Sequence, residues 1–284
     1  MEQIFGVGKL VGGTYHNGTL IRNGSLYHWG AEDDSTGGWL AELAGDNYRG
    51  FINPGDPTIG YHDGGAFRFS EDRFDRISGL PFDGSKKPNT SYYLGEYGNL
   101  EWDPRCFQCM YSPVGSELWR TEDGGASWAL VHDFGGDKII SVKVSPRDPQ
   151  RMYVSHKQSG SVWRIHRTSD GGSTWDLASL SFTENGNNNN KPIYLDVDAT
   201  NPDRAWCILT GTQSGYKVFE TTDAGETWQN QTTSTISGER VISIAHQRGS
   251  EGGVYIGTTQ AVYYRDDAMD DWLLYNTGLP AINV

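Results

Sequence analysis

The chain has 284 residues and a formal net charge of −13. An acidic protein of this kind is not expected to bind nucleic acid, because phosphate recognition requires clustered Lys and Arg. No apolar run approaches the roughly 20 residues that span a bilayer, so we expect no direct insertion into a membrane. The 37 Gly, 10 Trp and 15 Tyr residues are typical of many short strands joined by tight turns.

The first predicted strands lie in the segment KLVGGTYHNGTLIRNGSLYHW, residues 9–29. We expect two strands there and a hairpin turn at Asn23-Gly24, because Asn-Gly favours tight hairpin turns. The segment GGWLAELAG, residues 37–45, is expected to complete this group of strands. Residues 50–81 then read as a strand, a turn rich in Pro and Asp, and a second strand.

The same phrase of strand, turn and strand recurs further along the chain. It is clearest in ISVKVSPRDPQRMYVSH, where Ile140, Val142 and Val144 alternate with polar residues before the turn and Met152 and Val154 alternate after it. Related phrases are GNLEWDPRCFQCMYSPV, IYLDVDATNPDRAWCIL and ISIAHQRGSEGGVYIGT. Each is followed by a third strand-like segment.

A nine-residue box follows each third strand. RTEDGGASW, RTSDGGSTW and ETTDAGETW end at Trp128, Trp175 and Trp228. A fourth copy, YRDDAMDDW, ends at Trp272; it has lost the glycines but kept Asp267. The interval of roughly 50 residues is the period of a repeat architecture.

Each repeat therefore contains four short strands, which is the pattern of a β-propeller blade. A single four-stranded meander cannot bury both of its faces, whereas stacked blades cover one another. We predict an all-β fold, with residues 1–284 forming a single β-propeller domain of six blades. A seventh blade and a place within a longer protein stay open. The predicted blades are residues 1–46, 47–91, 92–137, 138–191, 192–239 and 240–284.

The box reads as a structural fastener rather than a catalytic motif. Its Asp can accept hydrogen bonds from backbone N–H groups two or three residues on, and its Gly can adopt a positive φ. Its Trp can pack back over the turn, and we expect Trp175 to fill a large buried site. Catalytic carboxylates must converge, whereas residues repeated once per blade diverge. The predicted structural residues are Asp123, Gly125, Trp128, Asp170, Gly172, Trp175, Asp223, Gly225, Trp228 and Trp272.

These boxes resemble the Asp-box, or BNR, repeat of sialidases, some endoglucanases, sortilin-like receptors and many secreted bacterial surface proteins. The phrases GTYHNGT, LAGDNYRGFINPGDPTIGY and VYYRDDAMDDWLLYNTGLP look like secreted propellers of Bacteroidetes-type bacteria. The resemblance implies a secreted or cell-surface β-propeller. It implies no particular activity, because one fold supports many functions.

Non-catalytic binding or scaffolding, with a glycan or a protein as partner, is the main functional prediction. The first 115 residues depart from the repeat more often than the later blades do, and such departures tend to mark functional places. Aromatic rings near amide and carboxylate groups suit polyhydroxylated ligands. The candidate ligand-binding residues are Tyr15, His16, Asn17, Asp46, Tyr48, Arg49, Glu96 and Tyr97.

A glycoside hydrolase or polysaccharide lyase acting at the central funnel of the propeller is the alternative. It needs two carboxylates and aromatic platforms for sugar rings. Sialidase activity is disfavoured, because the chain has no Arg-Ile-Pro-like motif and no matched set of arginines to grip a carboxylate. The candidates for this alternative are Asp46, Glu96 and Asp103 with Tyr48, Tyr97 and Trp102.

No cofactor and no metal ion are expected. The segment LDVDATNPD, residues 195–203, contains acids that could suit calcium, but the corresponding VKVSPRDPQ has Lys and Ser in place of two of them. We therefore predict a turn there. Cys106 and Cys109 form a C-x-x-C without a second Cys or His pair for zinc. We expect plain thiols at these positions, with a local disulfide left open.

Overall fold

The structure is a computed structural model, and the residues it describes are 2–3, 10–14, 18–22, 40–42, 51–62, 65–69, 74–76, 100–125, 127–136, 138–158, 162–183 and 193–276. The chain forms two compact units, one of residues 1–114 with 118–130 and one of residues 115–117 with 131–284. Each unit is described by itself. Every regular element within the described ranges is a β-strand. No helix there is long and apolar enough to cross a membrane.

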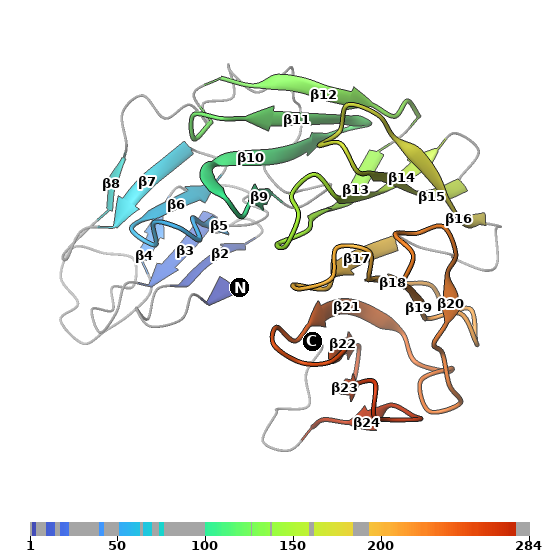
Figure 1. Cartoon of the computed structure of the whole chain (residues 1–284). Helices are drawn as coiled ribbons and strands as arrows, with labels where there is room; N and C mark the ends of the chain where they lie inside the picture. The colour runs from blue at the N-terminus through green and yellow to red at the C-terminus, as the bar shows by residue number, and fades with distance from the viewer. Residues whose placement is uncertain are drawn as a thin grey trace. The chain divides into compact units, whose positions relative to one another are not determined.

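The strands form six four-stranded antiparallel sheets, and neighbours in the chain are neighbours in each sheet (Figure 1). The first sheet contains β1 (Glu2–Gln3), β2 (Leu10–Thr14), β3 (Gly18–Arg22) and β4 (Leu40–Glu42). The second contains β5 (Phe51–Ile52), β6 (Ile59–His62), β7 (Gly65–Phe69) and β8 (Phe74–Arg76). The third contains β9 (Glu101–Asp103), β10 (Cys106–Val114), β11 (Glu117–Thr121) and β12 (Ala129–Asp133).

The last three sheets repeat this meander. The fourth contains β13 (Lys138–Val144), β14 (Met152–Gln158), β15 (Val162–Thr168) and β16 (Asp176–Thr183). The fifth contains β17 (Ile193–Val197), β18 (Ala205–Leu209), β19 (Val218–Thr221) and β20 (Gln229–Asn230). The sixth contains β21 (Val241–His246), β22 (Val254–Thr258), β23 (Val262–Arg265) and β24 (Leu273–Leu274).

The prediction of an all-β propeller with four-stranded blades is confirmed. Each sheet falls within one of the six predicted blade ranges. The organisation of residues 1–284 as a single domain stays a prediction.

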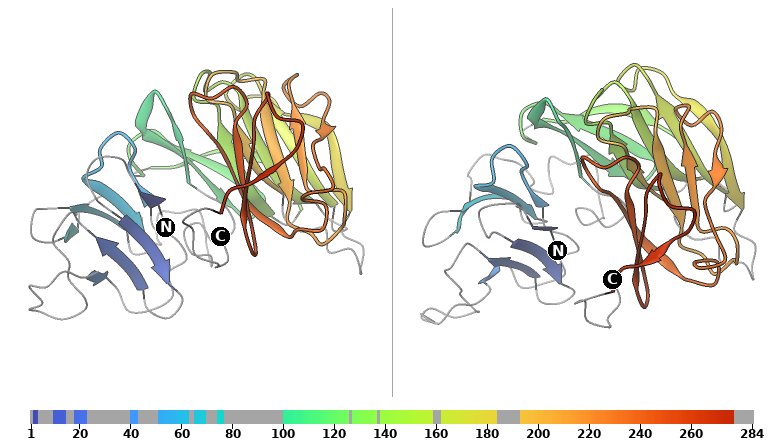
Figure 2. Two further views of the ribbon diagram at one scale, coloured as in Figure 1. Left: turned by 90° about the horizontal axis from the view of Figure 1, so that it is seen from below. Right: turned by 60° about the horizontal axis from the view of Figure 1, so that its bottom comes forward.

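The three sheets of the second unit lie side by side (Figure 2), and β18 shows how they share their cores. Alternate residues of a strand point to opposite faces of its sheet. Ala205, Cys207 and Leu209 belong to the core shared with the fourth sheet, whereas Trp206 and Ile208 belong to the core shared with the sixth. A central strand of an inner blade is therefore buried on both faces.

Burial in β13 also differs from the pattern expected from the sequence. The sequence predicts an apolar face of Ile140, Val142 and Val144 with a polar face opposite. These three residues are buried, but the preceding Ile139 and the intervening Ser141 are buried as well. The predicted alternation does not carry over to burial, because the register of β13 against β14 shifts between Ile139 and Ser141. Ile140 belongs to the core shared with the fifth sheet.

The first hairpin differs from the prediction. Strand β2 pairs with β3 so that Thr14 lies opposite Gly18, and β3 ends at Arg22. The connection between these strands therefore lies before Asn23-Gly24, and that part of the prediction is wrong. The chain carries an equally favourable Asn17-Gly18 pair earlier in the same segment.

A separate small core holds the second and third sheets of the first unit together. Phe51, Tyr61, Leu100 and Met110 are buried in it, and the partly buried Trp102 packs against them. The Trp102 ring lies 6.2 Å from that of Phe51 and 6.1 Å from that of Tyr61. This core fixes the base of the β9–β10 hairpin.

Candidate functional site

The Asp box after β15 is closed by its own hydrogen bonds. The hydroxyl of Thr168 donates to Asp170 Oδ1 over 2.7 Å and accepts the backbone N–H of Gly172 over 3.1 Å. Asp170 in turn accepts the backbone N–H of Thr174 over 2.9 Å and the Thr174 hydroxyl over 2.6 Å. The Asp carboxylate is therefore occupied in holding the turn.

The same contacts recur in the two other complete boxes. The turn donors lower the pKa of both Asp170 and Asp223 to about 2, with the hydroxyl and backbone N–H of the following Thr as the main causes. Both carboxyl groups therefore stay ionised at neutral pH. The equivalent residues are Thr121, Asp123, Gly125 and Ser127 in one box and Thr221, Asp223, Gly225 and Thr227 in the other.

The box Gly and Trp complete the turn. Gly172 has a φ of +95°, and a Cβ there would lie 2.7 Å from the side chain of Val131. The indole Nε1 of Trp175 donates to the Gly172 carbonyl oxygen over 3.0 Å, so the ring lies over the turn. Trp175 is only partly buried, so the expectation that it fills a large buried site is wrong. Trp175 stands just before β16, the outer strand of its sheet, where solvent still reaches it.

Thr221→Val is expected to lower the free energy of unfolding by about 1–2 kcal/mol, because it removes the hydroxyl and leaves the N–H of Gly225 without its acceptor. Thr221 is buried, and its Oγ1 lies 2.8 Å from the Gly225 nitrogen. The neighbouring Thr222 is exposed and provides the matched control. Urea melts of Thr221→Val and Thr222→Val should differ clearly; equal melts would contradict the structural role of the box threonine.

The fourth, degenerate copy of the box works differently. Asp267 stands at the position of the box Asp, but its carboxylate pairs with Arg204, from the turn between β17 and β18, over 2.8 Å. The local turn is closed instead by Asp266, whose carboxylate accepts the backbone N–H of Ala268 and the hydroxyl of Tyr264. Arg265 stands where the other boxes have Thr. The carboxylate that accepts the turn hydrogen bonds is therefore that of Asp266, one residue before the usual box position.

A small polar cleft of about 130 Å³ lies between the fifth and sixth sheets, around this ion pair. Arg204 contacts Glu220 over 2.6 Å as well as Asp267, and this pairing lowers the pKa of Asp267. The Arg204 guanidinium lies 4.9 Å from the centroid of the Trp206 ring. The His246 ring stacks on the same indole, with 5.1 Å between the ring centroids. Arg204 balances the charges of Glu220 and Asp267, and the indole of Trp206 already has stacking partners. The cleft therefore holds two blades together and does not present a reactive carboxyl.

The acidic residues at the end of β17 and in the turn after it have their oxygens directed to protein donors. Asp198 is buried and accepts hydrogen bonds from Thr200 and Asn201. Asp196 contacts Lys143 and the backbone N–H of His246, and Asp203 contacts Arg151. No group of three His, Cys, Asp or Glu side chains among the described residues is placed to hold a metal ion.

We expect a chelator to leave the melting temperature unchanged, because these three acids already have protein partners. Thermal melts with EDTA and with added calcium provide the measurement. A melting temperature that falls with EDTA and recovers with calcium would contradict the turn and reveal a bound cation.

The predicted ligand-binding set is not placed by the structure. Of the candidates for a hydrolase, Asp103 is buried at the β9–β10 turn, and its carboxylate accepts the backbone N–H of Arg105 over 3.0 Å. Trp102 is partly buried and packs against the small core of Phe51, Tyr61, Leu100 and Met110. The residues outside the described ranges are Tyr15, His16, Asn17, Asp46, Tyr48, Arg49, Glu96 and Tyr97, and their role stays a prediction.

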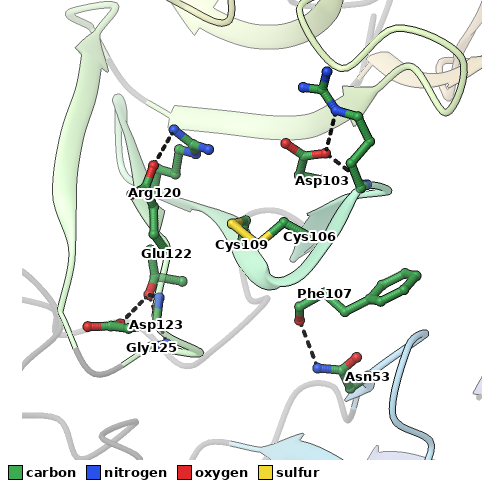
Figure 3. Close-up of a disulfide and its surroundings, with 11 residues drawn as sticks. Asn53, Asp103, Cys106, Phe107, Cys109, Arg120, Glu122, Asp123 and Gly125 are labelled. Carbon is green, nitrogen blue, oxygen red and sulfur yellow. Dashed lines mark hydrogen bonds and ion pairs between the residues drawn. A yellow bond between two sulfur atoms is a disulfide. The ribbon is translucent and has the colours of Figure 1, made fainter.

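Cys106 and Cys109 form a disulfide at the tip of the β9–β10 hairpin (Figure 3), so the expectation of plain thiols is wrong. In a regular strand, Cα atoms three residues apart are separated by roughly 10 Å. The register of β10 against β9 shifts between Cys106 and Met110, and the two cysteine Cα atoms lie only 5.1 Å apart. The irregularity that permits the bond has no clear sequence signal. Cys207 is free and buried.

Comparison with known proteins gives three kinds of match. The Sortilin-Vps10 family model (sortilin, neurotensin receptor 3) matches residues 116–237. A xyloglucanase of Paenibacillus sp is 28% identical over 153 residues, which are 46% of this chain and 15% of that protein. A xyloglucanase of Hypocrea jecorina (strain QM6a) is 31% identical over 148 residues, 49% of this chain and 17% of that protein. The alignments thus cover less than a fifth of the length of these curated relatives.

A similar solved structure is the GH74 enzyme of Niastella koreensis, with a TM-score of 0.59 and 16% sequence identity. The likeness covers 96% of this chain and 47% of that chain. At this level of identity it establishes a shared fold and nothing about activity.

Proposed function

Because this chain is a β-propeller of Asp-box repeats, similar to sortilin-like propellers, we propose that it is a glycoside hydrolase propeller that binds a neutral glucan of the xyloglucan type. The observation that carries the proposal is the match of about half the chain to two proteins that are both xyloglucanases. We therefore rank glycoside hydrolysis above non-catalytic binding, which is the reverse of the order predicted from the sequence.

Charge supports a neutral substrate. A protein with a net charge of −13 repels anionic glycans at long range, whereas an uncharged polysaccharide meets no such barrier. Sialic acids and the uronate substrates of polysaccharide lyases are anionic. Among carbohydrate-active functions, hydrolysis of a neutral glucan therefore fits this chain best.

The Cys106–Cys109 disulfide supports a place outside the cell. Disulfides persist in oxidising compartments and are rare where thiols are kept reduced. Secretion or display at the cell surface follows as part of the proposal.

A catalytic pair must include a carboxyl that can act as general acid, which requires a raised pKa. Asp133, Asp198 and Asp267 instead have lowered pKa values, because hydrogen-bond donors or Arg204 favour their ionised forms. These groups are poorly suited to donate a proton. We keep Asp46 and Glu96 as the proposed pair.

Binding without catalysis is the second candidate, and the match of residues 116–237 to the sortilin family model favours it. In this case a glycan or protein partner would bind the same propeller without bond cleavage. Further modules of a longer chain would then supply any chemistry.

The test measures binding and hydrolysis separately on xyloglucan, an unsubstituted β-1,4-glucan and a polyuronate. Affinity electrophoresis reports binding, and release of reducing ends reports hydrolysis. We expect both with xyloglucan and neither with the polyuronate. Asp46→Asn and Glu96→Gln should lower hydrolysis by roughly 10²–10⁴-fold while retaining binding. Glu122→Gln, at an exposed box residue, is the matched control.

Binding without release of reducing ends would favour the second candidate. Absence of both with every polysaccharide would reject the glucan proposal. Unchanged hydrolysis in Asp46→Asn and Glu96→Gln would reject that pair and leave the substrate class standing.

A further inference from the structure

The tip of the β9–β10 hairpin presents one aromatic side chain to solvent. Phe107 lies between the two cysteines of the disulfide and is 42% exposed, and its neighbour Gln108 is exposed as well. Figure 3 shows the Phe107 ring directed away from the disulfide. Single exposed apolar residues are common on protein surfaces, so exposure alone means little. What distinguishes Phe107 is how it is held.

Three separate contacts restrain this residue. The disulfide closes the chain on both sides of it, between Cys106 and Cys109. The buried amide of Asn53 donates to the Phe107 carbonyl oxygen over 2.8 Å (Figure 3). The ring lies directly against Gly55, where an added Cβ would come within 1.8 Å of it.

Asn53 also organises the loop on which the ring rests. Its Oδ1 accepts the backbone N–H groups of Gly55 and Asp56 over 2.9 and 3.1 Å. Its Nδ2 is shared between the Phe107 carbonyl and the hydroxyl of Tyr61. One buried side chain thus shapes the loop and fastens the hairpin tip to it, and both lie in the first unit.

A rigid, exposed ring is suited to stacking against a ligand. The C–H face of a pyranose packs on an aromatic ring, and holding the ring in place before binding reduces the entropy lost on binding. The adjacent Gln108 offers an exposed amide for sugar hydroxyls. The nearby cation, Arg105, is paired with Asp103, which leaves the tip without an excess of positive charge for an anionic ligand.

We propose that Phe107, clamped by the Cys106–Cys109 disulfide and seated on Gly55, is a stacking platform for a sugar ring of a neutral polysaccharide. This inference rests on the proposed function and adds a binding residue to it. It also makes polysaccharide affinity dependent on the oxidised state of the hairpin tip.

Affinity electrophoresis in xyloglucan, with the full chain, tests the platform. Phe107→Ala should weaken binding roughly three- to tenfold, and Phe107→Trp should retain or strengthen it. Gly55→Ala should weaken binding, because the added methyl group displaces the Phe107 ring. The residue at position 107 and the disulfide are themselves unchanged in this variant. Tyr216→Ala is the matched control, because Tyr216 is 45% exposed and stacks on Phe219 within the second unit.

The disulfide is tested by Cys106→Ser with Cys109→Ser, and by reduction and reoxidation of the wild type. Weaker binding with an unchanged melting temperature supports a clamp that acts on the platform. Binding that is unaffected by loss of the disulfide overturns the clamp.

The outcomes separate this inference from the proposed function. A wild-type protein that binds no neutral polysaccharide overturns both. If the wild type binds and Phe107→Ala binds equally well, only the platform is overturned, and the proposed function stands. An equal loss in Tyr216→Ala also overturns it, because the effect would not be specific to the tip.

Discussion

Trp163→Ala is expected to lower the free energy of unfolding by about 3–5 kcal/mol, the largest effect of any substitution considered. Trp163 is 1% exposed and lies in the core shared by the fourth and fifth sheets. Removing its ring loses apolar burial and leaves a cavity that the two sheets cannot close without shifting toward each other. Urea denaturation followed by far-ultraviolet circular dichroism provides the measurement.

Trp175→Ala is the matched comparison, because it removes the same side chain from a partly buried place in the Asp box. Its cost should be smaller, about 1–2 kcal/mol, since less apolar area leaves water on folding. If the box variant lost as much stability as Trp163→Ala, the assignment of the core to the interior of the blades would be wrong.

Acidification from pH 7 to pH 4 is expected to destabilise the second unit by on the order of 2–3 kcal/mol through His166. Its ring lies 4.6 Å from that of Phe134 and 5.5 Å from that of His156. Burial, followed by the nearby His156, His132 and Arg164, lowers the pKa of His166 to about 4.

The sign of this effect follows from the depressed pKa. The unfolded chain binds the proton with the ordinary pKa of 6.5, more tightly than the folded chain does. Stability is therefore complete above pH 6.5 and is lost as the pH falls from 6.5 towards 4. Asp170 and Asp223 lose their contribution only at lower pH, between 3.8 and about 2.

His166→Gln should flatten the stability profile between pH 6.5 and pH 4, because the amide does not titrate there. Melting temperatures of wild type and variant at several pH values in that window give the comparison. Profiles with the same slope would show that another group is responsible.

The fold could be predicted largely from the sequence, because its signals repeat. Four apolar segments and a box recur, and an error in one copy is corrected by the others. The first hairpin shows the limit: Asn23-Gly24 and Asn17-Gly18 are both good turn sequences, and only the pairing of Thr14 with Gly18 decides between them. The burial of Ile139 and Ser141 likewise depends on neighbouring elements rather than on the strand itself.

The candidate site is tested at few positions. Of the carboxylates that the sequence offered as reactive, Asp103 accepts a local hydrogen bond, whereas Asp46 and Glu96 lie outside the described residues and stay a prediction. The sequence does not indicate that Phe107 is exposed, because nothing in the segment FQCM, residues 107–110, distinguishes an exposed ring from a buried one. Its signal was the pair of cysteines around it, which becomes informative only when the bond between them is known.

By itself, the sequence determined the Asp boxes, because the hydrogen bonds of their Thr and Asp side chains join residues no more than four positions apart, as between Thr221 and Gly225. Spacing and residue type are sufficient when both partners lie in one turn. The tertiary structure alone decided the contacts between distant segments. Arg204 meets Asp267 across 63 positions, and Asn53 meets Phe107 across 54. Such pairs exist only because the sheets stack, and the stacking depends on the packing of all the blades together rather than on any local pattern.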